Sequence, residues 1–328
     1  MFTLRQYLLA LLDSRGLTRT LGEIDVCRDE QGRPCFSAGN SAAVFRIRLG
    51  GRIRSLRCYL RPMRHLKEIY GQRLLEKELY LHTSPETGVW VDTVLGDWIE
   101  GSTLHETVAQ AAALRDRESL QILVRLFDRL ALALVTDDRA HGDLKPENII
   151  VGDDGTLCPI DFDASYLPAF AGEISPELGT AAYQHPARTA ADFDERIDDY
   201  PAALISTALH ALAEAPTLWD RYGSSDGLLY TPQRIASDPA YRETLALFEK
   251  RGMAVQYRIA QLLTAPTLRL FGLAELLAEA VREKPAARSG TEAETPELFV
   301  ENGRWGYRTA ERVVVAPLYD NGFDFTEG

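Results

Sequence analysis

The stretch that decides the fold reads HGDLKPENIIV over residues 141–151 and resumes as CPIDFD over residues 158–163. Asp143 and Asn148 lie five residues apart in a proline-containing loop that runs into an apolar strand. Asp161 follows a second apolar strand, after a Gly-Asp-Asp-Gly turn. Because a tight turn between two strands makes a hairpin, this order predicts that Asn148 and Asp161 lie side by side.

These residue types predict a magnesium site beside a reactive carboxylate. Carboxylate and amide oxygens are ligands that Mg²⁺ prefers, and two of them leave positions open for the phosphate oxygens of ATP. Phosphoryl transfer also needs a carboxylate that orients the attacking hydroxyl and a cation for the migrating charge. Residues of all the required types are present within this stretch: Asp143, Lys145, Asn148 and Asp161. The alternative interpretation is a solvated acidic loop beside a core strand.

The stretch resembles the catalytic loop of eukaryotic-like Ser/Thr protein kinases, in which HRD-L-K-P-x-N is followed by DFG. The resemblance implies that Asp143 is the catalytic base and Lys145 the cation that stabilises the transition state. It also implies that Asn148 and Asp161 are the metal ligands. Six residues of the kinase pattern recur in register between strands, which makes the solvated-loop interpretation the weaker one.

Later segments resemble the same family in chain order. The sequence GTAAYQHP at 179–186 resembles the kinase segment that ends in Ala-Pro-Glu, beside which the substrate peptide lies. Asp198 begins a DDYPAAL stretch and is implied to accept hydrogen bonds from the backbone of the catalytic loop. Arg269 falls where these kinases keep a late structural arginine. The resemblance spans about residues 37–283 and is most specific in its second half.

The first half of the resemblance concerns nucleotide binding. SAGNSAAV at 37–44 aligns with the glycine-rich loop G-x-G-x-x-G-x-V, and its small residues permit a close approach of backbone to phosphate. Arg57 stands where the ATP-binding lysine is expected; arginine keeps the charge but directs it differently. Its partner glutamate is Glu68 or Glu76. Residues 97–101 resemble the hinge, and the implied cofactor-binding residues are Gly39, Val44, Arg57, Asp97, Trp98 and Ile99, the tryptophan and isoleucine contacting adenine.

Three positions depart from the protein-kinase pattern. Gly142 replaces the arginine of HRD, Asp163 the glycine of DFG, and Ala187 the glutamate of Ala-Pro-Glu. HGD and D-x-D are the versions seen in small-molecule kinases of the aminoglycoside-phosphotransferase type, so a small-molecule acceptor is one alternative. A pseudokinase scaffold that binds partners is another alternative. It is favoured by Arg57, by Asp163 and by the loop at 37–44, which keeps only the middle glycine of the pattern, but it is opposed by the complete set of catalytic residues.

Composition limits the class of protein. The chain has 328 residues and a net charge of −12, which disfavours nucleic acid as a partner. Its four cysteines show no CxxC spacing, so we expect neither a zinc site nor a disulfide framework. No apolar run approaches the roughly 18 residues that a membrane span needs. The N-terminal stretch lacks the organisation of a signal peptide. We therefore expect a cytoplasmic protein without a membrane partner.

The pattern of apolar residues predicts an α+β fold with the two lobes of a protein kinase and a small C-terminal β unit. A helix is expected over 1–13, short strands over 24–60, a helix over 64–81 and a strand over 89–99. Further helices are expected over 120–135, 201–213, 241–250, 252–263 and 273–283. The predicted boundaries are 1–96 for the N-terminal helix and N-lobe, 97–283 for the C-lobe, 284–297 for a linker and 298–328 for the β unit.

The last segment, 298–328, resembles a WG repeat, a short β-hairpin module that occurs in tandem in bacterial proteins. The alternative is one isolated hairpin packed on the kinase. A single repeat buries little of its own surface, so we expect the sequence to be a piece of a longer bacterial protein and the segment to bind a protein partner. The predicted activity is ATP- and Mg²⁺-dependent phosphorylation of Ser/Thr hydroxyls on a protein substrate.

Overall fold

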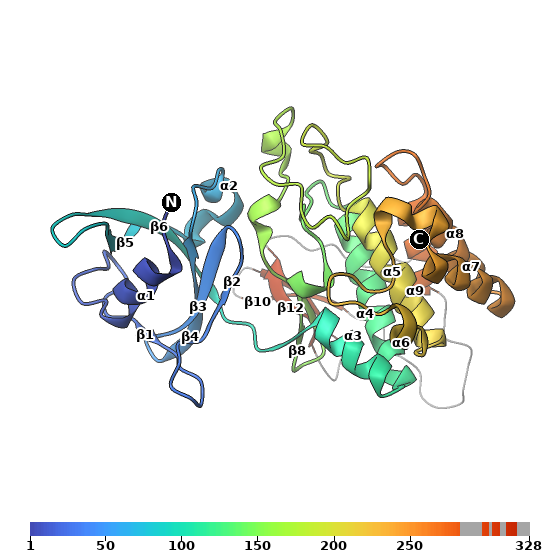
Figure 1. Ribbon diagram of the computed structural model, residues 1–328, viewed down its shortest axis with the longest axis horizontal. Coiled ribbons are helices and arrows are strands. Elements are labelled where there is room, and N and C mark those ends of the chain that lie inside the picture. Colours follow the sequence, from blue (N-terminus) through green and yellow to red (C-terminus); the bar gives the residue numbers. More distant parts are fainter. Residues whose placement is uncertain (283–296, 302–303, 309–312, 320–328) are drawn as a thin grey trace. The chain divides into compact units, whose positions relative to one another are not determined.

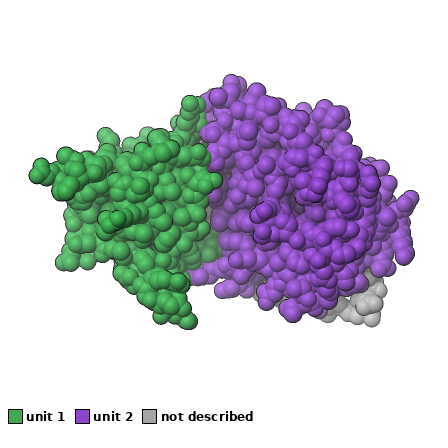
Figure 2. Space-filling view, in the orientation of Figure 1, with its two compact units in different colours: residues 1–99 green, residues 100–328 purple. Residues whose placement is uncertain are grey.

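The computed structural model describes residues 1–282, 297–301, 304–308 and 313–319. These residues form helices and antiparallel sheets, which confirms the predicted α+β class. The chain divides into two compact units, residues 1–99 and residues 100–328 (Figure 2). The two-lobed arrangement of a kinase stays a prediction.

A curled antiparallel sheet makes up most of the first unit (Figure 1). Its strands are β1 (Asp25–Val26), β2 (Phe36–Ala38), β3 (Ala42–Leu49), β4 (Arg52–Tyr59), β5 (Leu74–His82) and β6 (Gly88–Asp97). They lie in the order β1-β3-β4-β6-β5, and β2 also pairs with β3. The strands predicted within 24–60 and the strand predicted over 89–99 are thus confirmed.

The N-terminal helix α1 (Leu4–Leu12) packs into the core of this unit. Thr3 and Gln6 form a capping box that satisfies free N–H groups at the start of the helix. Tyr7 is fully buried, and its hydroxyl donates to the carbonyl of Tyr59 at 2.6 Å. Burial of one such large side chain contributes about 1.5–3 kcal/mol to folding. The predicted N-terminal helix is therefore confirmed as a packed element.

The helix predicted over 64–81 is wrong over most of its length. Only α2 (Leu66–Tyr70) is α-helical; a 3₁₀ turn, Gly71–Arg73, follows it, and the rest of the segment is β5. Gly71 has a φ of 51°, which ends the helix. Leu79 and Leu81 alternate along β5 and are both fully buried, and β5 pairs with β6. Pairing with the next strand along the chain thus overrides a short run of helix-like spacing.

Helices dominate the second unit, and those predicted at five places are confirmed. The five are α4 (Arg117–Thr136), α5 (Asp199–Glu214), α7 (Pro239–Arg251), α8 (Ala254–Leu262) and α9 (Leu273–Arg282), and two helices that were not predicted, α3 (Leu104–Ala113) and α6 (Leu218–Tyr222), accompany them. Helix α5 is buried along nearly its whole length and packs against α4 and α8, so it forms the centre of the core. Among the residues described, no helix has both the length and the apolar character needed to cross a membrane.

Two small antiparallel sheets complete the second unit. One contains β7 (Gly101–Thr103), β8 (Ile149–Gly152) and β9 (Leu157–Pro159). The other contains β10 (Glu297–Glu301), β11 (Arg304–Arg308) and β12 (Val313–Tyr319), in line with the strands expected near the C-terminus. The predicted linker, 284–297, lies outside the described residues apart from its last position. The likeness to a WG repeat and the partner it implies stay predictions.

Candidate active site

The β8–β9 hairpin sets the geometry of the site. Ile149 lies opposite Pro159, and one residue further along the hairpin the N–H of Ile160 donates to the carbonyl of Asn148 at 2.8 Å. The predicted hairpin is therefore confirmed, and it brings the backbone of Asn148 beside the residue that precedes Asp161. Asp161 has a φ of 69°, a left-handed conformation that costs a non-glycine residue about 1 kcal/mol or more.

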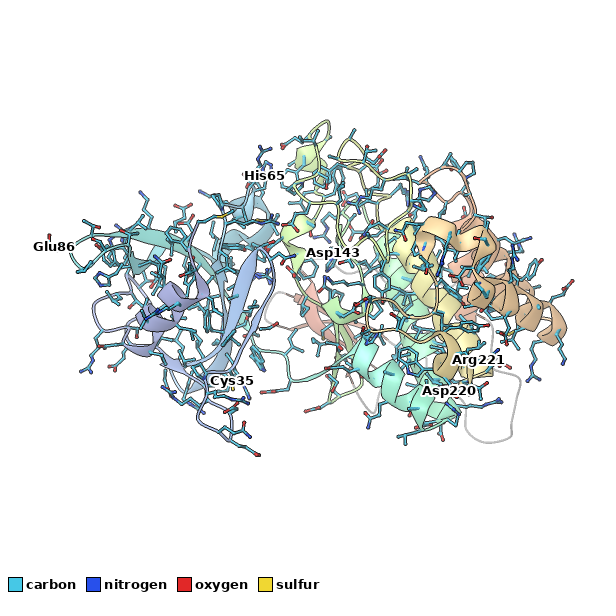
Figure 3. The ribbon with its side chains drawn as sticks, in the orientation of Figure 1. Cys35, His65, Glu86, Asp143, Asp220 and Arg221 are labelled. Atoms are coloured by element: carbon cyan, nitrogen blue, oxygen red, sulfur yellow. The ribbon has the colours of Figure 1, made fainter. Side chains whose placement is uncertain are left out.

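Asp143 lies in the loop between α4 and β8, where Figure 3 labels it, and is the centre of a hydrogen-bonded network. Its Oδ2 lies 3.2 Å from the ammonium of Lys145 and accepts from the side-chain amide of Asn148, also at 3.2 Å. The same amide donates to the backbone carbonyl of Asp143 at 2.9 Å. The structure thus brings together three of the four predicted catalytic and metal-binding residues by direct contact.

Thr180 joins this network from a distant segment. Its backbone N–H donates to Oδ1 of Asp143 at 2.5 Å, and its hydroxyl accepts from Lys145 at 2.8 Å. The preceding Gly179 has a φ of 71°, and a Cβ there would lie 2.8 Å from the carbonyl of Gly142. Glycine at 179 is therefore what lets this segment approach the catalytic loop so closely.

Asp198 holds the backbone of the catalytic loop, as the resemblance implied. It is 1% exposed and accepts from the N–H groups of His141 and Gly142, the second at 3.0 Å. Burial raises the pKa of Asp198, whereas His141 and the two N–H groups favour its charged form. His141 in turn contacts the carbonyl of Ile160 through Nε2 at 2.8 Å, which links the loop to β9.

Gly142 departs from the kinase pattern for a steric reason. Its φ is 81°, and a Cβ at this position would lie 2.0 Å from the carbonyl oxygen of Ala164. No side chain fits there without a movement of the backbone. The position that holds arginine in the related pattern is thus closed to arginine in this loop.

Arg188 contacts this loop, although no catalytic role was predicted for it. The side chain is buried, and its Nη1 donates to the carbonyl of Gly142 at 3.0 Å and to the side-chain carbonyl of Gln184. The only available signal was an arginine close behind the segment that resembles Ala-Pro-Glu. Spacing along the chain does not reveal the contact, since 46 positions separate the two residues.

Asp199, the neighbour of Asp198, anchors a later loop. It is 3% exposed, and its Oδ2 accepts from the N–H of Leu270 at 3.1 Å. Burial raises the pKa of Asp199 to about 6, while the charges of Arg196 and Arg269 oppose that rise. Arg269, the predicted late structural arginine, therefore acts on the charge of Asp199. The glutamate of the Ala-Pro-Glu pattern is replaced by Ala187 in this chain.

Two of the predicted nucleotide-binding residues of the first unit, Val44 and Arg57, lie on one face of its sheet. Val44 lies opposite Arg57, so both point away from the face that bears the buried Phe45 and Leu56. Arg46, on the same face as Val44, lies over the ring of Trp98 at 5.6 Å. Such a cation–π contact holds the indole in one orientation.

Four further predicted residues lie outside these contacts. Gly39 is exposed in the β2–β3 turn, and its N–H donates to the carbonyl of Ala42 at 2.9 Å. Asp97 forms an ion pair with Arg54 at 3.3 Å. Ile99 is half-buried at the end of the first unit. Glu76 forms an exposed ion pair with Lys67 at 3.6 Å, so a role as partner of Arg57 stays a prediction, as it does for Glu68.

The donor atoms at the hairpin fit a magnesium ion shared with phosphates. Because the amide nitrogen of Asn148 is used toward Asp143, its amide oxygen is the atom left for a cation. Asp161, the other predicted ligand, follows β9 and carries a carboxylate. Within the described part of the chain, no group of three or more His, Cys, Asp or Glu side chains is placed to hold a metal. A pair of oxygen ligands completed by nucleotide phosphates and water suits Mg²⁺ rather than Zn²⁺.

Comparison with known proteins gives a weak but consistent similarity. No family model matches the chain. CBL-interacting protein kinase 17 of Oryza sativa subsp. japonica is 28% identical over 172 residues, which cover 50% of this chain and 35% of the rice protein. Serine/threonine-protein kinase PknL of Mycobacterium tuberculosis (strain ATCC 25618 / H37Rv) is 28% identical over 219 residues, which cover 61% of this chain and 52% of that kinase.

The chain thus spans about a third to a half of the length of these relatives. Both are protein kinases by name, the mycobacterial one a serine/threonine-protein kinase, and the curled sheet followed by helices is compatible with a kinase-like fold. The similarity to Ser/Thr protein kinases, although low, supports a protein-kinase-like domain in this chain.

Proposed function

We propose that this protein is an ATP- and Mg²⁺-dependent phosphotransferase that phosphorylates Ser/Thr hydroxyls of proteins. One observation carries the proposal: Asp143, Lys145, Asn148 and Thr180 form one hydrogen-bonded network at the end of the β8–β9 hairpin. Relatives that are protein kinases by name support the choice of a protein substrate.

Each residue of the network has a role in this proposal. Asp143 accepts the proton of the substrate hydroxyl and orients its oxygen toward the γ-phosphate. Lys145 offsets the charge that develops on the migrating phosphoryl group. Asn148 and Asp161 would hold Mg²⁺, which neutralises phosphate charge when it is bound. The face of the first sheet that bears Val44 and Arg57 would contribute to ATP binding, with Arg57 on the inner phosphates and Trp98 and Ile99 on adenine.

A phosphotransfer assay tests this function. Purified protein is incubated with ATP labelled at the γ-phosphate, Mg²⁺ or Mn²⁺, and either a generic protein acceptor or an aminoglycoside. We expect metal-dependent labelling of the protein acceptor. Transfer to the aminoglycoside alone would favour a small-molecule kinase, which the D-x-D pattern of Asp161 and Asp163 also fits. No transfer to either acceptor, with ATP still bound, would favour a pseudokinase.

Mg-ATP is expected to stabilise the folded protein through Asp161. A ligand at 100 times its Kd raises the free energy of unfolding by about 2.7 kcal/mol. Asp161→Ala removes the carboxylate ligand and is expected to abolish the magnesium-dependent part of this gain, measured as a shift in melting temperature with ATP, with and without Mg²⁺. Asp153→Ala is the matched control, because Asp153 is an exposed carboxylate on the same hairpin. If ATP raises the melting temperature equally with and without Mg²⁺, and equally in Asp161→Ala, the metal assignment is contradicted.

Activity is expected to be independent of phosphorylation in the segment between Asp161 and Pro186. Ser175 is 7% exposed, its hydroxyl donates to the carbonyl of Glu177 at 2.5 Å, and its N–H donates to Ala190 at 2.8 Å. A phosphate there would have to break this packing. Treatment with phosphatase should therefore leave the rate unchanged, and so should Ser175→Ala.

Substitution of Thr180, unlike that of Ser175, is expected to lower the rate of phosphotransfer. The hydroxyl of Thr180 bonds the charged Lys145, and loss of such a bond costs about 1.5–3 kcal/mol, or about 10- to 100-fold in rate if the bond persists in the transition state. Thr180→Ala should lower the rate by that factor, whereas Thr180→Ser retains the hydroxyl and most of the activity. A large loss on phosphatase treatment that ATP restores would overturn the prediction.

A further inference from the structure

Arg188 occupies an unusual environment for a charged side chain. It is 9% exposed and lies among residues of the catalytic loop and of the segment that carries Thr180. Only Nη1 donates, to Gly142 and Gln184; Nε and Nη2 have no hydrogen-bond partner among the described residues. Burial of a cation with two unused donors is unfavourable unless its charge is balanced nearby.

Two carboxylates supply that balance. Burial lowers the pKa of Arg188, and the charges of Asp198 and Asp143 are the largest effects that oppose it. The cation therefore lies in the field of the proposed base and of the aspartate that holds the loop backbone. A position that served packing alone would be filled at lower cost by an apolar side chain.

The contacts of Gly142 show what the cation does. The N–H of Gly142 donates to Asp198 at 3.0 Å, and its carbonyl accepts from Arg188, also at 3.0 Å. Both polar groups of the residue that precedes Asp143 are thus fixed by buried charged side chains of opposite sign. Because Gly142 has no side chain of its own, these two hydrogen bonds act directly on its left-handed backbone.

We propose that Arg188 is a positioning residue, which clamps the Gly142 carbonyl and thereby holds Asp143 in its working orientation. Arg188, which lies in the segment that follows Thr180, thus restrains the catalytic loop at a position where an arginine at 142 would have no room. The inference rests on the proposed phosphotransfer. The inference also implies that the catalytic loop stays in place without phosphorylation of the segment between Asp161 and Pro186.

The test compares Arg188→Ala and Arg188→Lys with the wild type in steady-state phosphotransfer. Displacement of a catalytic group by about 1 Å lowers rates by about 100-fold, so Arg188→Ala should lower kcat by about 10- to 100-fold. The KM for ATP should stay within about twofold, because the loop backbone rather than a nucleotide contact has changed. Arg188→Lys keeps one donor and should retain more activity. Guanidinium ion at millimolar concentration should partly restore Arg188→Ala, and urea should not.

Arg196→Ala is the matched control for general loss of stability. Arg196 is half-buried, with 29% of its side chain exposed, and also donates to a backbone carbonyl, that of Val135, which lies outside the catalytic loop. The control should lower the melting temperature without the specific loss of kcat and without rescue by guanidinium. An unchanged kcat in Arg188→Ala, or a loss equal to that of the control without rescue, would overturn the proposal.

Amide hydrogen exchange separates this inference from the proposed function. The N–H groups of His141 and Gly142 are protected by Asp198, and release of the Gly142 carbonyl should speed their exchange in Arg188→Ala but not in Arg196→Ala. If the wild type transfers no phosphate, the proposed function fails, and the exchange still decides whether Arg188 restrains the loop. Equal exchange in the two variants would sink the clamp whatever the activity.

Discussion

Gly142→Arg, which restores the HRD pattern of the related kinases, is expected to inactivate this protein rather than improve it. The free energy of unfolding should fall by about 2–5 kcal/mol, because strain in the backbone adds to a steric clash. The left-handed φ of 81° accounts for about 1–2 kcal/mol of this for a residue with a Cβ. The rest arises because that Cβ would lie 2.0 Å from the carbonyl oxygen of Ala164.

Gly142→Ala tests the same cause with the smallest side chain. The measurement is chemical denaturation together with phosphotransfer, and both should show most of the loss seen for arginine. Gly252→Ala is the matched control: Gly252 has a φ of 68° at the end of α7, and a Cβ there meets nothing within 4 Å. It should lose only the strain component. If Gly142→Ala is as stable and active as Gly252→Ala, the close approach to Ala164 is not what fixes glycine at 142.

Asp143→Asn should lower kcat by about 10²–10⁴-fold, the range of general base catalysis. Asparagine has nearly the shape of aspartate but accepts a proton poorly. It also places an N–H₂ group where Oδ1 accepts from Thr180 or where Oδ2 meets Lys145 and Asn148, so two donors face each other. Affinity for ATP should change little, because Asp143 contacts substrate hydroxyl rather than nucleotide in the proposed mechanism.

Asp137→Asn is the matched control for Asp143→Asn. Asp137 forms an ion pair at 3.0 Å with Arg139, two residues further on, as Asp143 does with Lys145, but it lies outside the network. Single-turnover rates and the Kd for ATP, measured for both variants, separate chemistry from binding. A wild-type rate in Asp143→Asn would mean that another group takes the proton.

Local order made the catalytic hairpin predictable, because its turn, two short strands and loop residues are contiguous. The same holds for α4, whose apolar spacing is long and regular. Segment 64–81 failed because its apolar residues fit both helical and alternating patterns, and pairing between β5 and β6 decided the outcome. Glu78 lies in the same segment, and its contacts were not predicted either. It is 1% exposed and accepts from the N–H groups of Thr20 and Leu21 at 2.8 Å each, a partnership across more than 50 positions of sequence.

The site divides in the same way. Asp143, Asn148 and Lys145 are close in sequence, and their contacts follow from one loop. The contact of Asp198 with the backbone of the loop was expected only through family resemblance. The contact of Arg188 and the need for glycine at 142 both depend on segments that are distant in sequence. The carbonyl of Ala164 packs against Gly142, and Arg188 reaches the carbonyl of Gly142 from the segment that follows Thr180. No pattern along the chain encodes those approaches.

The strand at 74–82 limits how the first unit could act as a switch. A helix on a surface can rotate or slide by small amounts, which makes graded control possible. Strand β5 is joined to β6 by a ladder with a register shift between Leu75 and Leu79, and beyond the shift Leu79 and Leu81 are buried whereas Tyr80 between them is half-buried. A shift by one residue would turn Leu79 and Leu81 out of the core and expose their apolar surface. Control through this segment would therefore have to be all-or-none, with detachment of the strand as its elementary event.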